Sequence, residues 1–278
     1  MKAIIAAFFL FLGTSLIGQN GAPLPAGARG VGMGNTGISN RDIHSIFSNI
    51  ASTAFLQGTQ FAIFGEERFA GSGISNIAVG GAHSFGIGAF GLILQNYGIE
   101  DFNEQKIGLG YARKLSEKLS LGVQFDVINT RITDHGSASI FTFEIGILAP
   151  ISKELTFGAR IFSPIRVTIV EEEEVLGVLG LGFSYQPSKK VTFNGEVEKG
   201  VDTDISIRAG IEYQIHSVVS LRIGGASNPT LVTFGLGFKI SDQFSIDVAS
   251  SYHQTLGLSP GVGLRYGLKN SAPLSGRK

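Results

Sequence analysis

Residues 115–127 read Leu-Ser-Glu-Lys-Leu-Ser-Leu-Gly-Val-Gln-Phe-Asp-Val, a polar turn followed by strict alternation of apolar and polar side chains. Successive side chains of a β-strand point to opposite faces, so this pattern predicts a turn that leads into a strand with one apolar face. The same layout returns at residues 151–159, 187–193, 215–221 and 240–246. Five copies, about 25 to 36 residues apart, predict an up-and-down meander of antiparallel strands.

The composition of the chain narrows its function. The 278 residues include no Cys, no Trp, 39 Gly and 21 Phe, and 22 basic side chains balance 22 acidic ones. Balanced charge gives no electrostatic basis for a nucleic-acid partner. A chain without cysteine has no disulfide framework and no thiolate metal site. Only 16% of the residues are charged, which suits strands whose two faces meet different surroundings.

The chain divides into four predicted parts. They are a signal peptide at residues 1–18, an N-terminal plug at 19–57, a β-barrel at 58–268 and a tail at 269–278. The first part has Lys2, then an apolar run and small residues, which is the layout of a secretory signal. The second part is dense in glycine around residues 27–37 and has a mild helical rhythm over residues 41–56.

Alternation from about residue 58 to residue 268 predicts about fourteen strands. We expect them near 59–67, 74–83, 85–95, 105–114, 118–131, 138–149, 154–163, 174–186, 189–198, 203–215, 218–225, 230–239, 243–253 and 257–268. Single-chain bacterial membrane barrels have an even number of strands, and nine to eleven residues cross a bilayer at a tilt. The short turns lie at one end, with the N-terminus, and we expect that end to face the periplasm.

The apolar face of each strand admits two interpretations. In a soluble sandwich it would form the core, whereas in a membrane barrel it would face lipid while the polar face lines the lumen. The face opposite the apolar side chains is rich in Gly and Ser, which suit a crowded lumen. Many apolar rows start or end with Phe or Tyr, as interfacial girdles do. We therefore predict an all-β fold, an antiparallel transmembrane β-barrel of about fourteen strands with an N-terminal plug.

The N-terminal segment resembles that of the FadL superfamily. Gly27-Ala28-Arg29 and Gly32-Met33-Gly34 are followed by Asn49-Ile50-Ala51, ahead of the predicted barrel. The superfamily includes fatty-acid channels and the PorV-type barrels of type IX secretion. In its channels, a hatch with an Asn-Pro-Ala motif sits in the lumen, and Ile50 stands here in the place of that proline. The resemblance implies that Gly32, Met33, Gly34, Asn49, Ile50 and Ala51 belong to a plug.

Charged residues on the polar face of the strands are the other candidates. They are Asp126, Glu144, Arg160, Glu196, Glu198, Arg208, Glu212, Arg222, Asp247 and Arg265. Both signs occur on neighbouring strands, so we expect ion pairs across strands or across the lumen. Such pairs would hydrate and neutralise a filled interior, and the alternative is a selective pore.

The remaining sequence motifs do not predict a nucleotide-binding, metal-binding or catalytic site. Residues 32–37 match the dinucleotide fingerprint GxGxxG, but no strand precedes them and no βαβ unit follows, as that fingerprint requires. The five histidines have no metal-ligand spacing. We therefore expect no enzyme activity, no metal and no cofactor. The acidic run of residues 171–174 lies in a predicted outer loop, where it would be solvated or would bridge to lipopolysaccharide through a divalent cation.

The sequence leaves three functions open for a protein of the Gram-negative outer membrane. The leading hypothesis is an accessory, partner-binding subunit of a protein secretion or assembly machine, as PorV-type barrels are. The alternatives are a FadL-like channel for small hydrophobic molecules and a narrow polar pore. The expected partners are outer-membrane lipid, lipopolysaccharide and other outer-membrane or periplasmic proteins, and no nucleic acid.

Overall fold

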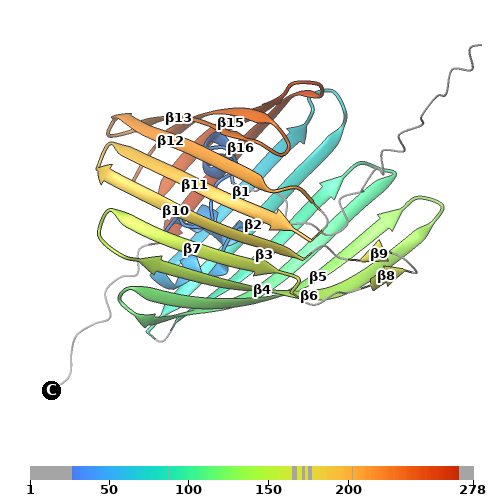
Figure 1. The fold of residues 1–278 in the computed structure, drawn as a ribbon, viewed down its shortest axis with the longest axis horizontal. Coiled ribbons are helices and arrows are strands. Elements are labelled where there is room, and N and C mark those ends of the chain that lie inside the picture. Colours follow the sequence, from blue (N-terminus) through green and yellow to red (C-terminus); the bar gives the residue numbers. More distant parts are fainter. Residues whose placement is uncertain are drawn as a thin grey trace, which may run out of the picture.

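The computed structural model describes residues 27–86, 88–164, 168–170, 173–174, 177–201 and 203–268. The predicted signal peptide and tail lie outside these ranges, as do residues 19–26. Within the described ranges, fourteen antiparallel strands form one closed barrel (Figure 1). The predicted fold class, a transmembrane β-barrel of about fourteen strands, is confirmed.

The barrel strands agree with the predicted ranges to within a few residues. They are β1 (Thr59–Arg68), β2 (Ile74–Phe85), β3 (Gly88–Gly98), β4 (Phe102–Ser116), β5 (Leu119–Ile132), β6 (Gly136–Pro150), β7 (Leu155–Phe162), β10 (Val178–Ser188), β11 (Val191–Gly200), β12 (Ser206–His216), β13 (Val219–Ala226), β14 (Leu231–Lys239), β15 (Phe244–His253) and β16 (Gly257–Leu268). Each barrel strand pairs with the barrel strands before and after it in this order. β1 also pairs with β16, for example Phe61 with Tyr266, which closes the barrel.

The largest boundary difference concerns β10. We expected this strand to begin at residue 174, but it begins at Val178. The residues before it make another pairing, because β9 (Glu173–Glu174) joins β8 (Thr168–Val170) in a separate two-stranded sheet. The connection between β7 and β10 therefore carries its own hairpin at one end of the barrel (Figure 1).

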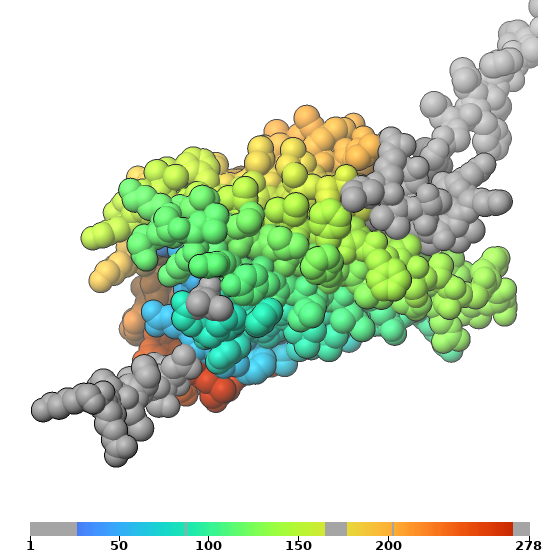
Figure 2. Space-filling model, turned by 90° about the horizontal axis from the view of Figure 1, so that it is seen from below, coloured from blue at the N-terminus to red at the C-terminus, as the bar shows by residue number. Residues whose placement is uncertain are grey.

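The two faces of the wall differ as the alternation predicts. On β5 and β6, Phe125 and Phe141 point outward and are 68% and 71% exposed, whereas Gln124 and Asp126 point inward and are each 1% exposed. Large outward-facing apolar side chains recur on every barrel strand, and Figure 2 shows β4 to β7, in green and yellow-green, forming one continuous surface. Soluble monomers rarely expose apolar patches above a few hundred Å². This outer surface is therefore the lipid-facing band of a membrane barrel.

The two ends of the barrel differ in their connections. The turn end carries the connections at residues 116–119, 150–155, 188–191, 216–219 and 239–244, together with the start of β1 and the end of β16. The loop end carries the connections after β1, β3, β5, β7, β11, β13 and β15. Several of these are also short, such as residues 132–136, so neither end builds a large domain.

Residues 27–57, here called the N-terminal segment, lie inside the barrel (Figure 1). They form α1 (Ala28–Gly32) and two short 3₁₀ helices, η1 (Ile43–Phe47) and η2 (Ile50–Phe55). Among the described residues, no helix has the length and apolar character to cross a membrane.

Glycines on the inner wall let the N-terminal segment approach the strands closely. A Cβ added at Gly122 of β5 would lie 2.7 Å from both the amide nitrogen of Ala51 and Cγ2 of Ile50. Real Cβ atoms do not approach other atoms so closely, so a larger residue there would displace the segment. Gly34 has φ +75°, a conformation that side chains with a Cβ rarely adopt, and a Cβ there would lie 2.6 Å from the carbonyl oxygen of Gly225.

Candidate functional site in the barrel lumen

Asn49 joins the N-terminal segment to the barrel wall. Its side-chain Nδ2 donates hydrogen bonds to the carbonyl oxygens of Ile38, at 2.8 Å, and Ile147, at 3.0 Å. Its Oδ1 accepts a bond of 3.0 Å from the amide of Ala51 and so caps η2. The residue is 1% exposed. The amide side chain thus connects two parts of the N-terminal segment to β6, with both its donor and acceptor used.

The other residues assigned to the plug pack against glycines of the wall. Ile50 contacts the inner face at Gly110 and Gly122 of β4 and β5. Met33 lies against Gly210 and Gly224 of β12 and β13. Gly32 lies against Gly235 of β14, and its carbonyl accepts a hydrogen bond of 3.2 Å from Thr233. Gly34 donates to the same hydroxyl at 2.9 Å. Two glycines of the GxGxxG match, Gly32 and Gly34, therefore serve close packing against strands, whereas Gly37 packs against Ser48 within the N-terminal segment.

We expect Asn49→Ala to loosen the N-terminal segment. The substitution leaves the amide of Ala51 and the carbonyl of Ile38 without their side-chain partner in a buried site, at a cost of about 1–3 kcal/mol for each unsatisfied group. A loss of about 3 kcal/mol would raise the rate of proteolytic cleavage within residues 27–57 about 100-fold, when that rate follows the open population.

Asn129→Ala is the matched control for this prediction. Asn129 donates to the hydroxyl of Ser139 at 2.8 Å in an exposed setting. Its removal should change the cleavage rate less than about fivefold, because water can replace the exposed hydrogen bond. Equal cleavage of the two variants would show that Asn49 does not hold the segment in place.

A first ionic network crosses the inner wall from β4 to β12. Its members are Lys106, Asp126, Glu144, Arg160, Glu198 and Arg208. Lys106 Nζ lies 2.8 Å from Glu144 and 3.3 Å from Asp126. Arg160 lies 3.1 Å from Glu198, which also pairs with Arg208. Since unpaired buried charge is costly, the alternating signs stabilise one another in a narrow lumen.

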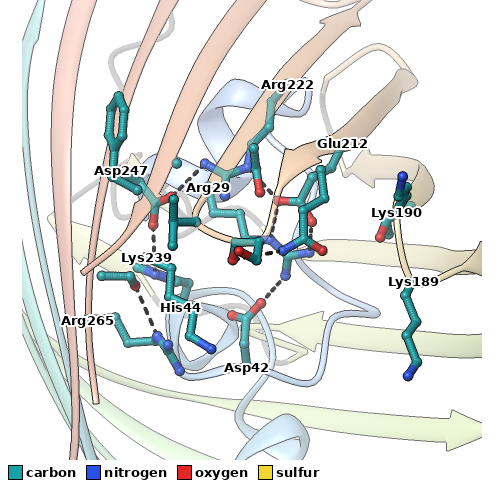
Figure 3. A pocket seen from close by; sticks show the side chains of 18 of the residues that line it. Arg29, Asp42, His44, Lys189, Lys190, Glu212, Arg222, Lys239, Asp247 and Arg265 are labelled. Atoms are coloured by element: carbon teal, nitrogen blue, oxygen red, sulfur yellow. Dashed lines mark hydrogen bonds and ion pairs between the residues drawn. The ribbon is translucent and has the colours of Figure 1, made fainter. Parts of the chain in front are cut away.

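A second ionic network joins the N-terminal segment to β12, β13 and β15 (Figure 3). Its members are Arg29, Asp42, His44, Glu212, Arg222 and Asp247. Arg222 lies 2.6 Å from Glu212 and 2.6 Å from Asp247. Arg29 lies 2.7 Å from Glu212 and also pairs with Asp42. Each carboxylate of this network has at least one cationic or imidazole partner.

The charge of Asp42 depends on this network. Burial alone would raise the pKa of its carboxyl group, but the adjacent Arg29 guanidinium outweighs burial and holds that pKa below its usual value. Asp42 therefore remains ionised at neutral pH and pairs with Arg29 inside the N-terminal segment.

Glu196 has a different role from the other predicted lumen charges. One carboxylate oxygen accepts hydrogen bonds from the backbone amides of Gly37, at 2.5 Å, and Ile38, at 2.7 Å. On the same strand, Asn194 donates to Thr36, at 3.2 Å, and Asn40, at 2.9 Å. β11 thus holds the middle of the N-terminal segment through hydrogen bonds.

The structure places nine of the ten predicted lumen charges in these three groups. The tenth, Arg265 on β16, donates from Nε to the hydroxyl of Ser245 at 3.1 Å. Sequence reasoning missed four members of the ionic networks, Lys106, Arg29, Asp42 and His44. Lys106 could have been found, because it shares the inward face of β4 with Gly108 and Gly110. Arg29 and His44 lie in a segment without strand alternation, so no periodicity pointed to them.

An apolar cluster lines the lumen toward the loop end. It consists of Ile128, Ile140, Phe162 and Val178 from four adjacent strands. Ile128 lies opposite Ile140 in the register of β5 and β6, and Phe162 lies opposite Val178 in that of β7 and β10. The Lys106 ammonium of the first network lies 5.0 Å from the centre of the Phe162 ring. The apolar cluster and the first ionic network are thus in direct contact.

Groups that could hold a metal ion are absent from the described residues, where no three His, Asp or Glu side chains are suitably grouped. Within the described residues, the lumen therefore offers ion pairs, hydrogen bonds and two apolar clusters. One is the cluster toward the loop end, and in the other Ile46 and Ile50 of the N-terminal segment pack with wall residues such as Phe64 of β1. Together with the lipid-facing outer surface, these features define a transmembrane β-barrel with an occupied interior.

Comparison with known proteins identifies the kind of barrel. No protein-family model and no curated protein matches the chain. Among solved structures, the TodX deltaS2S3 mutant monoaromatic hydrocarbon channel superposes with a TM-score of 0.71 at 13% identity, over 87% of this chain and 99% of its own. The toluene transporter TbuX of Ralstonia pickettii gives 0.65 at 12% identity, over 87% and 98%. A FadL homologue of Pseudomonas aeruginosa gives 0.61 at 12%, over 87% and 97%. The chain therefore has the FadL-like barrel fold.

Proposed function

We infer that this protein is an outer-membrane channel for small hydrophobic molecules. The observation that carries the proposal is the apolar cluster of Ile128, Ile140, Phe162 and Val178, which lies toward the loop end and is formed by barrel strands alone, whereas the other apolar cluster of the lumen includes the N-terminal segment. Apolar side chains in that position do not face lipid. They pack against one another at 0–7% exposure, and a hydrophobic molecule that enters from the loop end would extend this apolar packing. The solved structures that share the fold are described as hydrocarbon channels and toluene transporters, which supports the same function.

This proposal reverses the order of the hypotheses drawn from the sequence. The accessory role in a secretion or assembly machine receives no support from the proteins that share the fold, whereas the channel does. The paired charges of the lumen weighed against an apolar path. In the structure those charges lie beside the apolar cluster, with Lys106 over the Phe162 ring. The charged and the apolar side chains therefore occupy adjacent parts of the lumen.

The orientation that we propose places the loop end outside the cell and the turn end in the periplasm. Single-chain bacterial barrels carry short periplasmic turns and longer external loops. The apolar cluster then lies toward the outer mouth, where a molecule enters. We further propose that the N-terminal segment closes the periplasmic part of the lumen in this state, since it contacts strands on opposite sides of the barrel, among them β1 to β6 and β13 to β16.

The test measures uptake of radiolabelled toluene by cells that express this chain and have no hydrocarbon channel of their own. We expect faster uptake than in cells with an empty vector. The double variant Ile128→Asn, Ile140→Asn should slow uptake about tenfold, because bound toluene would then face buried amides that lose their water. Lumen-facing polar residues are compatible with membrane insertion.

The control for this experiment is Ile128→Val, Ile140→Val, which keeps the cluster apolar. Its uptake should stay within about twofold of that of the unmodified protein, since it removes one methylene from each side chain. Uptake equal to the empty vector for the unmodified protein would reject the channel function. Equal uptake by both double variants would reject the role of the cluster.

A further inference from the structure

A cavity at the turn end has a lining with an excess of positive charge (Figure 3). Its volume is about 260 Å³, and the N-terminal segment and β10 to β16 contribute to its lining. The cationic residues of the lining are Arg29, Lys189, Lys190, Arg222, Lys239 and Arg265, and the acidic ones are Asp42, Glu212 and Asp247. Positive side chains thus outnumber negative ones by three, with His44 left out of the comparison. We call this space the basic cavity.

Half of these cations are already neutralised. Arg29 and Arg222 belong to the second ionic network, where the three acidic residues of the lining are their partners. Lys239 lies 2.8 Å from Asp242, in an exposed pair at the edge of the barrel. The carboxylates of the lining are therefore engaged, and they do not balance the remaining positive charge.

The other three cations have no carboxylate within ion-pair distance in the part of the chain that the structure describes. Arg265 uses only Nε, in its bond to Ser245, so its two terminal nitrogens can bind the paired oxygens of a carboxylate or a phosphate. Lys189 and Lys190 lie in the turn between β10 and β11, across the cavity from Arg265 (Figure 3). Three positive charges around one space attract an anion to it.

Neutral groups of the lining fit the same ligand. Thr192, Gln214 and Ser220 bring hydroxyl or amide donors to the wall of the basic cavity. A volume of about 260 Å³ is slightly below the range of common small-molecule pockets, about 300–1,000 Å³. The space thus suits a small organic acid or a free phosphate group and is too small for a folded partner.

We propose that the basic cavity is a binding site for the oxyanion group of a small molecule, a carboxylate or a phosphate. Arg265 holds the two oxygens, and Lys189 and Lys190 neutralise the charge from the opposite side. This site goes beyond the proposed channel function, because an uncharged hydrocarbon has no group for these cations to bind. It lies at the other end of the lumen from the apolar cluster, so the two can be tested separately.

The experiment titrates the purified full-length protein in detergent micelles with benzoate, inorganic phosphate or benzyl alcohol, by isothermal titration calorimetry at low ionic strength. We expect saturable binding of benzoate and no saturable binding of benzyl alcohol, which has the ring without the charge. Arg265→Gln should weaken benzoate binding about tenfold, the equivalent of one charge-assisted bond. Raising NaCl to about 0.5 M should weaken it further, since salt screens exposed lysines.

Two variants separate this site from general attraction to a basic surface. Lys118→Gln and Lys153→Gln each remove an exposed lysine at the same end, outside the cavity lining, and should leave benzoate affinity within about twofold of the original. Lys189→Gln, Lys190→Gln should weaken binding at least as much as Arg265→Gln. The heat-dependent migration of folded barrels in gels confirms that each variant is folded.

The outcomes decide between the ligands and test the site. Benzoate binding alone identifies a carboxylate on an organic body as the ligand, and equal binding of phosphate identifies general oxyanion recognition; both support the proposal. Saturable binding of phosphate alone identifies a phosphate group as the ligand and also supports the proposal. It is overturned when neither benzoate nor phosphate saturates, when benzyl alcohol binds as tightly as benzoate, or when the cavity variants and the surface variants behave alike. The Ile128→Asn, Ile140→Asn variant should bind benzoate normally, so failure of the channel function would leave this result unaffected.

Discussion

Deleting residues 28–57 is expected to turn the protein into an open pore. The segment contacts the inner wall on opposite sides of the barrel. Its 3₁₀ helices η1 and η2 contact β1 to β6, and α1 contacts β13 to β16. The ladder of the fourteen strands is complete without it, because every strand pairs with two neighbours of the barrel. In planar bilayers, we expect single-channel conductance to rise at least about tenfold above that of the complete chain, as barrels of 16–18 strands with unfilled interiors conduct ions and water.

A second variant tests the same proposal without a deletion. Gly122→Leu places a side chain where Ala51 and Ile50 lie, and Gly210→Leu does so at Met33. The combination should displace the segment and raise conductance in the same direction. Gly65→Ala is the control, since a Cβ there meets no atom within 4 Å. An open conductance of the complete, unmodified chain would contradict the proposal that the segment closes the lumen.

Arg222→Met is expected to destabilise the barrel strongly. The Arg222 guanidinium lies 2.6 Å from both Glu212 and Asp247, and its side chain is 5% exposed. Removing one partner of a buried ion pair costs about 3–5 kcal/mol, because it leaves charge uncompensated. Arg29 and His44 still face the two carboxylates. We therefore expect a loss near the lower bound, about 3 kcal/mol, in the free energy of unfolding by urea in lipid vesicles.

The exposed pair of Lys239 and Asp242 provides the comparison for Arg222. Its side chains are 47% and 66% exposed, and exposed pairs contribute about 0–1 kcal/mol. Lys239→Gln should therefore change the unfolding free energy by less than about 1 kcal/mol. Adding Glu212→Gln and Asp247→Asn to Arg222→Met should recover part of the loss, since the buried negative charge is then gone. A loss below about 1 kcal/mol for Arg222→Met alone would contradict the role assigned to the second network.

The barrel could be predicted because its information is local. The alternation in residues 119–127 assigns each side chain to a face, and a shift of one residue would turn every apolar side chain to the wrong side. Short turns such as residues 116–119 then force neighbouring strands into antiparallel pairs. The start of β10 was misplaced because the competing hairpin of β8 and β9 is formed by pairing, which composition does not reveal.

The candidate sites were only partly predictable. The sequence identified the charges on the polar faces, and the Glu212–Arg222 pair follows from direct register between β12 and β13. Register alone fails for Glu196 and Arg208, which lie opposite each other on β11 and β12. In the structure, Arg208 pairs with Glu198, and Glu196 binds the backbone of the N-terminal segment. The N-terminal segment, which has no strand periodicity, thus binds Glu196, the carboxylate that the register of β11 and β12 places opposite Arg208.

By itself, the sequence determined that the chain forms antiparallel strands with one apolar and one polar face, because side chains of an extended backbone alternate whatever surrounds them. Only the tertiary structure decided which inner groups meet. Arg29 and Glu212 are 183 positions apart and become neighbours only when the barrel closes around the N-terminal segment. The apolar cluster and the basic cavity arise in the same way, since each gathers side chains from several strands whose approach no local pattern records.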